Sequence, residues 1–229
     1  MTMEKSQNSK TKNYFPQKVA VLIDGGFFLK RYNHCYGKNN NPEKVANDLF
    51  TMCLSHVEND ELYRIFYYDC PPLAKKAHNP ISKELIDFSK SEIAQFKYLF
   101  FEELKKKRKL ALRLGVLKDR GGWRIWSNRA KELYAGKIAF NEISAKDVYY
   151  DIVQKGVDIR IGIDIASLAF KKQVNKIILV SGDSDFVPAA KLARREGIDF
   201  VLDPMWQKIE RKLFEHIDGL ISKCPKPKK

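Results

Sequence analysis

Short apolar runs, each closed by turn residues, alternate along the chain with stretches in which apolar residues recur every three or four positions. Runs of the first kind are typical of strands buried on both faces, and stretches of the second kind are typical of amphipathic helices. Their alternation predicts a parallel sheet covered by helices. The runs at residues 19–23, 62–68, 176–180 and 198–202 predict four of its strands.

Three segments have a helical pattern. Residues 187–196 end at Gly197, and the strands on either side require a parallel, right-handed crossover. Residues 92–112 predict one long helix with an apolar stripe. The segment after Asp158 fits either a strand or a helix by its period. We interpret it as a helix with Asp158 as its N-cap, because the strand at 176–180 needs a crossover before it.

The 229 residues, 44% of them hydrophobic, suffice for one sizeable α/β core. We expect a single domain over residues 19–222, with a helix and a hairpin inserted between residues 92 and 140. The hairpin is predicted where Gly121 and Gly122 interrupt a strand-like stretch that ends in Trp123 and Trp126. Residues 1–18 and 223–229 are polar and rich in lysine, which predicts two disordered basic tails.

The balance of 42 Lys and Arg against 28 Asp and Glu gives a net charge of +14. Such a field attracts polyanions, so nucleic acid is the leading class of partner. The apolar run at 19–23 is far shorter than the roughly 20 residues that span a bilayer, and we expect no membrane anchor. The four cysteines form no CxxC pair and follow no signal peptide, which favours reduced thiols in a cytoplasmic protein.

Aspartates follow all four predicted strands: Asp24, Asp69, Asp183 and Asp203. They are expected at the carboxyl edge of the sheet, where open parallel sheets bind ligands. Aspartate also favours turns and caps, and we prefer that interpretation for Asp69 and Asp203, which adjoin prolines. Two glycines follow Asp24, and Asp185 closely follows Asp183. For these three acids we prefer a site for Mg²⁺ or Mn²⁺, which bind hard oxygen ligands.

Four stretches resemble the NYN domains of the PIN-like nuclease superfamily, in its bacterial branch. They are VLIDGGF (21–27), YYDCPP (67–72), QKGVDIRIGID (154–164) and LVSGDSDFVP (179–188). The resemblance implies a three-layer, Rossmann-like PIN fold with a mostly parallel sheet, Mg²⁺ or Mn²⁺, and endonucleolytic cleavage of RNA. By motif match, the acidic residues of the family correspond to Asp24, Asp158, Asp183 and Asp185, with Asp164 as a further candidate. Many members have Asn three positions after the first Asp, where this chain has Phe27.

The expected function is therefore that of a metal-dependent endoribonuclease acting on single-stranded RNA, with basic side chains holding the phosphate backbone. Lys155 is the cation nearest to the acids in sequence. The other expected contacts are the basic turn, Lys105, Lys106, Lys107, Arg108 and Lys109, together with Arg113. With Arg120, Arg124 and two tryptophans nearby, this turn could form a base-stacking platform. Its alternative is an ordinary solvated face.

Two rival functions are weaker. A phosphatase of the haloacid-dehalogenase type would fit GDSDF, but such enzymes need a second acid two residues after the nucleophilic aspartate, where this chain has Gly26. A non-catalytic RNA-binding or scaffold protein would keep the fold without turnover. The four retained acids argue against it, because like charges destabilise a fold unless a metal neutralises them. The sequence is compatible with a homo-oligomer.

Overall fold

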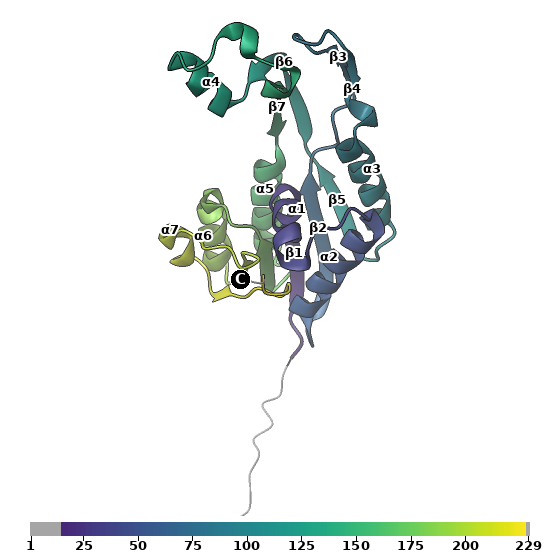
Figure 1. Cartoon of the computed structure of the whole chain (residues 1–229). Coiled ribbons are helices and arrows are strands. Elements are labelled where there is room, and N and C mark those ends of the chain that lie inside the picture. Colours follow the sequence, from purple (N-terminus) through teal and green to yellow (C-terminus); the bar gives the residue numbers. More distant parts are fainter. Residues whose placement is uncertain (1–14, 228–229) are drawn as a thin grey trace, which may run out of the picture.

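The computed structural model describes residues 15–227, in which six parallel strands form the central sheet (Figure 1). Their order is β10-β9-β8-β1-β2-β5. The strands are β1 (Lys18–Asp24), β2 (Glu61–Asp69), β5 (Leu110–Leu114), β8 (Lys176–Val180), β9 (Asp199–Asp203) and β10 (Gly219–Leu220). All four predicted strands are confirmed within a few residues. Residues 1–14, which hold most of the predicted N-terminal tail, lie outside the described residues.

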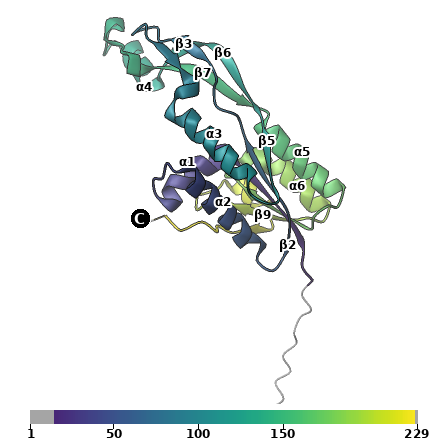
Figure 2. The same cartoon turned by 90° about the vertical axis from the view of Figure 1, so that its right-hand side faces the viewer.

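Helices cover both faces of this sheet (Figure 2). One face carries α1 (Gly25–Tyr36), α2 (Pro42–Val57) and α3 (Glu92–Lys105), and the other carries α5 (Val157–Phe170), α6 (Val187–Arg195) and α7 (Arg211–Phe214). The side chains of β1 show why both faces need a cover. Val19, Val21 and Ile23 pack on the first face, whereas Ala20 and Leu22 pack on the second. The predicted three-layer α/β fold is confirmed. None of the helices in residues 15–227 is long and apolar enough to cross a membrane.

The order of the strands reverses at β1. From β1 the chain moves outward to β2 and β5 on one side, and later from β8 to β9 and β10 on the other. The carboxyl ends of β1 and β8 therefore flank the switch point, which is the usual ligand site of an open parallel sheet. Asp24 ends β1, and Asp183 follows β8.

The predicted long helix at 92–112 is wrong in its last part. α3 ends at Lys105, Lys109 takes a positive φ of 60°, and β5 begins at Leu110. Leu110 and Leu112 pack beside α1–α3, whereas Ala111 packs on the opposite face. This alternation has the two-residue period of a strand. The helix was predicted because Ala111, seven residues after Leu104, also fits a continuing helical stripe.

A two-stranded arm extends beyond the carboxyl edge, directly after β5 (Figure 1). It consists of antiparallel β6 (Val116–Ile125) and β7 (Val148–Lys155), with α4 (Ser127–Tyr134) between them. The predicted hairpin within 115–126 is wrong, because β6 continues through Gly121 and Gly122 with a register shift and pairs with β7 instead. Beside the arm lie β3 (Lys76–His78) and β4 (Leu85–Asp87).

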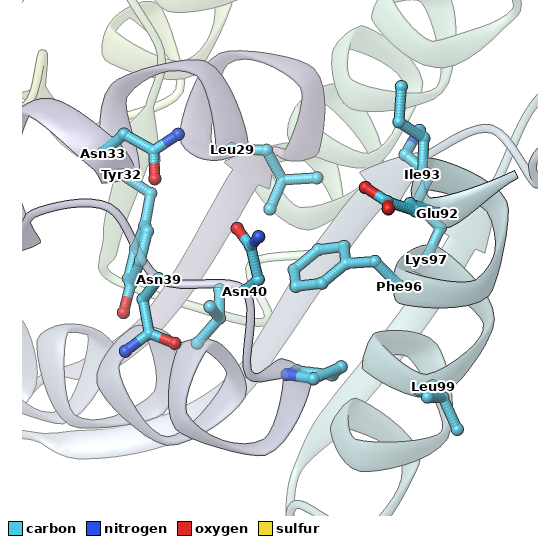
Figure 3. A pocket seen from close by; sticks show the side chains of 12 residues that line it. Leu29, Tyr32, Asn33, Asn39, Asn40, Glu92, Ile93, Phe96, Lys97 and Leu99 are labelled. Carbon is cyan, nitrogen blue, oxygen red and sulfur yellow. The ribbon is translucent and has the colours of Figure 1, made fainter.

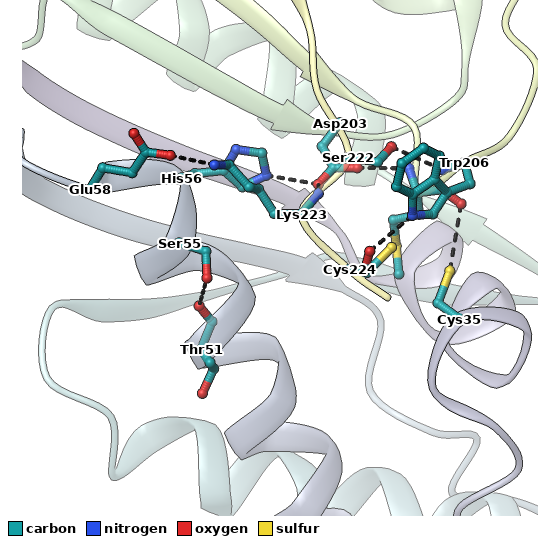
Figure 4. Close-up of polar contacts among 11 residues, drawn as sticks. Cys35, Thr51, Ser55, His56, Glu58, Asp203, Trp206, Ser222, Lys223 and Cys224 are labelled. Carbon is teal, nitrogen blue, oxygen red and sulfur yellow. Dashed lines mark hydrogen bonds and ion pairs between the residues drawn. The ribbon is translucent and has the colours of Figure 1, made fainter. Parts of the chain in front are cut away.

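The segment after β10 packs on the core instead of forming a free tail over its described residues (Figure 4). Cys224 is buried, and its carbonyl accepts a hydrogen bond of 2.9 Å from the indole of Trp206. The backbone N–H of Lys223 donates to Asp203, whose carboxylate also lies 2.7 Å from Nε2 of His56. Asp203 further accepts from the N–H of Met205, as expected of a turn aspartate.

The two glycines after Asp24 differ in the space around them. A Cβ on Gly25 would lie 2.5 Å from the ring of Tyr67 and 2.6 Å from the carbonyl oxygen of Tyr68, whereas a Cβ on Gly26 would meet nothing closer than 3.5 Å. Gly25→Ala is therefore expected to lower the free energy of unfolding by at least about 1–3 kcal/mol through overpacking. Gly26→Ala, the matched control, should lose no stability, because alanine is the better helix former. Urea unfolding of both variants checks this, and equal losses would contradict it.

Candidate functional site

Asp24 lies at the carboxyl end of β1 and is also the N-cap of α1, where its Oδ1 accepts a hydrogen bond of 3.0 Å from the N–H of Phe27. Burial raises the pKa of Asp24 to about 6, and repulsion from Asp158 and Asp69 adds to this, against the opposing effect of the Phe27 hydrogen bond. The capping and metal interpretations are thus compatible at this residue. The hydrogen bond of the cap lowers the pKa, but burial outweighs it, with repulsion from Asp158 and Asp69 as a smaller contribution.

Asp183 and Asp185 occupy the loop after β8. The buried Ser181 accepts a hydrogen bond of 3.2 Å from the N–H of Asp183, and Asp183 Oδ1 accepts one of 2.9 Å from the N–H of Asp185. Both acids are exposed. Phe27, at the position where many relatives have Asn, packs its ring against Gly182 of this loop, so that a Cβ there would lie 2.8 Å from the ring.

Asp158 stands in the first turn of α5, at the base of the arm. The predicted helix is confirmed, but the N-cap is Gly156 with a φ of 81°, so Asp158 does not cap the helix. Partial desolvation raises the pKa of Asp158, and repulsion from Asp183 and Asp185 raises it further. Electrostatic repulsion therefore acts between Asp24 and Asp158, and between Asp158 and both acids of the loop after β8. The structure brings these four predicted residues to one edge.

The donor set fits a hard divalent ion. In the described part of the chain, no three His, Cys, Asp or Glu side chains come close enough together to form a complete metal site. Mg²⁺ commonly binds through one or two carboxylates, with waters and substrate phosphates completing its shell. The four acids suit that mode, since they offer only oxygen and their mutual repulsion disfavours the ion-free charged state.

Asp164, the further candidate, has other partners. Its carboxylate accepts a hydrogen bond of 2.8 Å from the hydroxyl of Tyr68 and lies 3.2 Å from Nε of Arg113. The guanidinium of Arg113 also stacks over the ring of Phe66. This ion pair joins α5 to β5, and it gives both Asp164 and Arg113 a structural role.

The basic turn, residues 105–109, is not beside the acids. It connects the end of α3 to the start of β5, so it lies at the amino edge of the parallel sheet, a full strand away from Asp24. Its lysines have local partners, which include Glu102 for Lys105, Glu103 for Lys106 and the ring of Phe50 for Lys107. The expected platform is therefore divided, because the arginines and tryptophans of the arm stand at the opposite edge.

Lys97 and Gln154 are neighbours of the site that the sequence did not single out. Nζ of Lys97 donates a hydrogen bond of 2.7 Å to the fully buried Asp69, close to Asp24. Gln154 is the penultimate residue of β7, and its Oε1 lies 3.8 Å from the Cβ position of Gly26. Gln154 could have been identified from the sequence, because it begins the QKGVD stretch that resembles the family. No sequence pattern could relate Lys97 to Asp69.

A hollow of about 600 Å³ lies beside Lys97, between α1, α2 and α3 (Figure 3). Leu29, Phe96 and Ile93 give it apolar walls, and Asn33 and Asn40 add amide groups. It is separate from the four acids, none of which lines it.

The raised pKa of Asp24 has a measurable consequence for the metal-free protein. Because the folded-state pKa of about 6 exceeds the unfolded value of 3.8, the parent loses stability as pH rises through this window. In EDTA at pH 7.5, Asp24→Asn is expected to be about 2 kcal/mol more stable than the parent, since asparagine preserves the N-cap. The difference should shrink toward pH 4. Urea unfolding at both pH values checks this, and equal stability at pH 7.5 would refute it.

Comparisons with known proteins relate the chain to one family. The model of the NYN domain matches residues 85–221, more than half of the chain. The match contains Asp158, Asp183 and Asp185, while Asp24 precedes it. A crystal structure of a protein of unknown function from Vibrio parahaemolyticus is similar, with 16% identity, a TM-score of 0.45, and coverage of 90% of this chain and 93% of that one. No curated protein matches the chain.

Proposed function

Because the chain belongs to the NYN domain family, part of the PIN-like nuclease superfamily, we propose that it is a metal-dependent endoribonuclease acting on single-stranded RNA. The observation that carries this proposal is the position of Asp24, Asp158, Asp183 and Asp185 at the carboxyl edge of the sheet, where Asp24 and Asp183 flank the switch point. In the described part of the chain, no basic side chain forms an ion pair with any of these four carboxylates. Such a set suits Mg²⁺ or Mn²⁺.

The residues around the acids can hold a phosphodiester. α1 and α5 both begin at this edge, and the partial positive charge of their first turns favours phosphate. Lys155, exposed at the end of β7, adds a cation three residues before Asp158. A bound divalent ion would supply activation of a water and stabilisation of the leaving oxygen. The carboxylates then act as ligands, and Asp24 must be ionised to do so.

The test is an incubation of the purified chain with end-labelled RNA in Mn²⁺, Mg²⁺ or EDTA. We expect internal cleavage of single-stranded RNA with either metal and none in EDTA. Parallel incubations with the same sequence as double-stranded RNA and as single-stranded DNA define the class of substrate. Intact RNA under every metal condition, with RNA binding retained, would overturn the proposal and favour the non-catalytic RNA-binding alternative.

A further inference from the structure

The arm carries a cluster of aromatic side chains at the same edge as the acids. Trp123 and Tyr150 of the arm contact each other and Phe88, which lies in the short helical turn before α3, with ring centroids 5.3 to 6.1 Å apart. A second pair, Trp126 and Tyr149, is stacked at 4.3 Å. Trp126 keeps 48% of its surface exposed. Trp126 is thus stacked on one ring and still half-exposed, so it offers free aromatic surface to a planar ligand.

These rings line a cavity of about 520 Å³, which we call the arm pocket. Its size falls within the range of about 300–1,000 Å³ that is usual for small-molecule pockets. The lining runs from Trp123, Trp126 and Tyr149 down to Lys97 and Gln154. Those last two residues adjoin Asp69 and Gly26, respectively, at the edge of the sheet. The arm pocket is therefore continuous with the surroundings of Asp24.

The charges near the pocket favour an anionic strand over an apolar peptide. Lys75, which pairs with Asp119, lies over the ring of Tyr150, 5.1 Å from its centroid. Arg120 and Arg124 of β6 pair with Asp151 of β7, and Lys97 lines the pocket itself. The whole chain carries +14. Aromatic side chains on a positively charged protein are the combination that holds successive bases of single-stranded nucleic acid.

We propose that the arm pocket binds an unpaired nucleobase of the RNA strand whose phosphate lies at the acids. This inference rests on the proposed function, and it names the feature that selects single strands. A base paired in a duplex is stacked on both faces and cannot enter, so the pocket excludes double-stranded RNA from the acids. The specificity of the site then resides in the arm, which lies outside the sheet that carries the acids.

The test measures binding of a short labelled single-stranded RNA in EDTA, so that no cleavage interferes. Trp126→Ala and Tyr149→Ala should each weaken binding by about 5- to 150-fold, which corresponds to the loss of one stacked base. Tyr134→Ala is the matched control, because Tyr134 lies on α4 of the same arm, is 86% exposed and does not line the pocket. It should bind like the parent.

Inorganic polyphosphate, which has the charge but no bases, serves as the second probe. Its affinity should be the same for the parent and for Trp126→Ala. Equal RNA affinity in the parent and Trp126→Ala would overturn the pocket, as would a parallel loss of RNA and polyphosphate binding. If the parent cleaves RNA and these variants bind RNA normally, nucleobase binding in the arm pocket is refuted and the proposed function is not. A parent that binds through the pocket but never cleaves refutes only the proposed function.

Discussion

Asp24→Asn is expected to reduce the rate of RNA cleavage by at least about 100-fold, because even indirect partners of a bound metal typically contribute 10- to 100-fold. RNA binding in EDTA should persist, since the basic surface is unchanged. The variant is also expected to fold at least as stably as the parent at neutral pH, so the loss cannot be assigned to unfolding. Single-turnover cleavage in Mn²⁺ is the measurement.

Asp164→Asn is the matched control for this experiment. Asp164 belongs to the same motif as Asp158 and is also a carboxylate of α5, but it is engaged by Arg113 and Tyr68. We expect it to cleave RNA at nearly the parental rate with a small loss of stability. Cleavage that survives in Asp24→Asn but disappears in Asp164→Asn would place the site on the other side of α5.

Lys97→Met is expected to lower the free energy of unfolding by about 3–5 kcal/mol, because it leaves a buried carboxylate without its partner. Asp69 is fully buried, and Nζ of Lys97 lies 2.7 Å from its Oδ1. The double variant Asp69→Asn with Lys97→Met should recover much of the loss, since neither charge then remains. Urea unfolding at neutral pH measures all three proteins.

Lys105→Met on the same helix is the control for that substitution. Its ammonium pairs with Glu102 at the surface, with 57% of the side chain exposed. Exposed pairs of this kind contribute about 0–1 kcal/mol. If Lys97→Met is as stable as Lys105→Met, the buried pair does not hold α3 against β2.

The strands that build the site could be predicted because β1 and β8 are buried on both faces and read as unbroken apolar runs. β5 could not, since Ala111 falls on the helical stripe of α3, seven residues after Leu104. That single error also misplaced the basic turn. A turn that precedes a parallel strand lies at the amino edge, so recognising β5 would have separated Lys105 from the acids without any coordinates.

The residues of the site likewise divide into those that the sequence could place and those that it could not. Asp183 and Asp185 follow a recognisable strand, and Asp24 ends another, so sequence pattern and sheet topology together place them. The contacts of Lys97 with Asp69, and of Asp164 with Arg113, join residues that are distant in sequence. Such pairs depend on how the helices pack on the sheet, which no local pattern records. The ordered segment at Lys223 and Cys224 was missed for the same reason.

The most direct test of the metal site is the Mn²⁺ concentration that gives half the maximal rate of RNA cleavage, measured for the parent, Asp158→Asn and Asp164→Asn. Asp158 caps no helix, so its replacement by asparagine leaves the start of α5 intact. We expect Asp158→Asn to need about 10- to 100-fold more Mn²⁺, with part of its rate recovered at saturation, and Asp164→Asn to match the parent. An unchanged Mn²⁺ requirement in Asp158→Asn would contradict the assignment of these carboxylates as metal ligands.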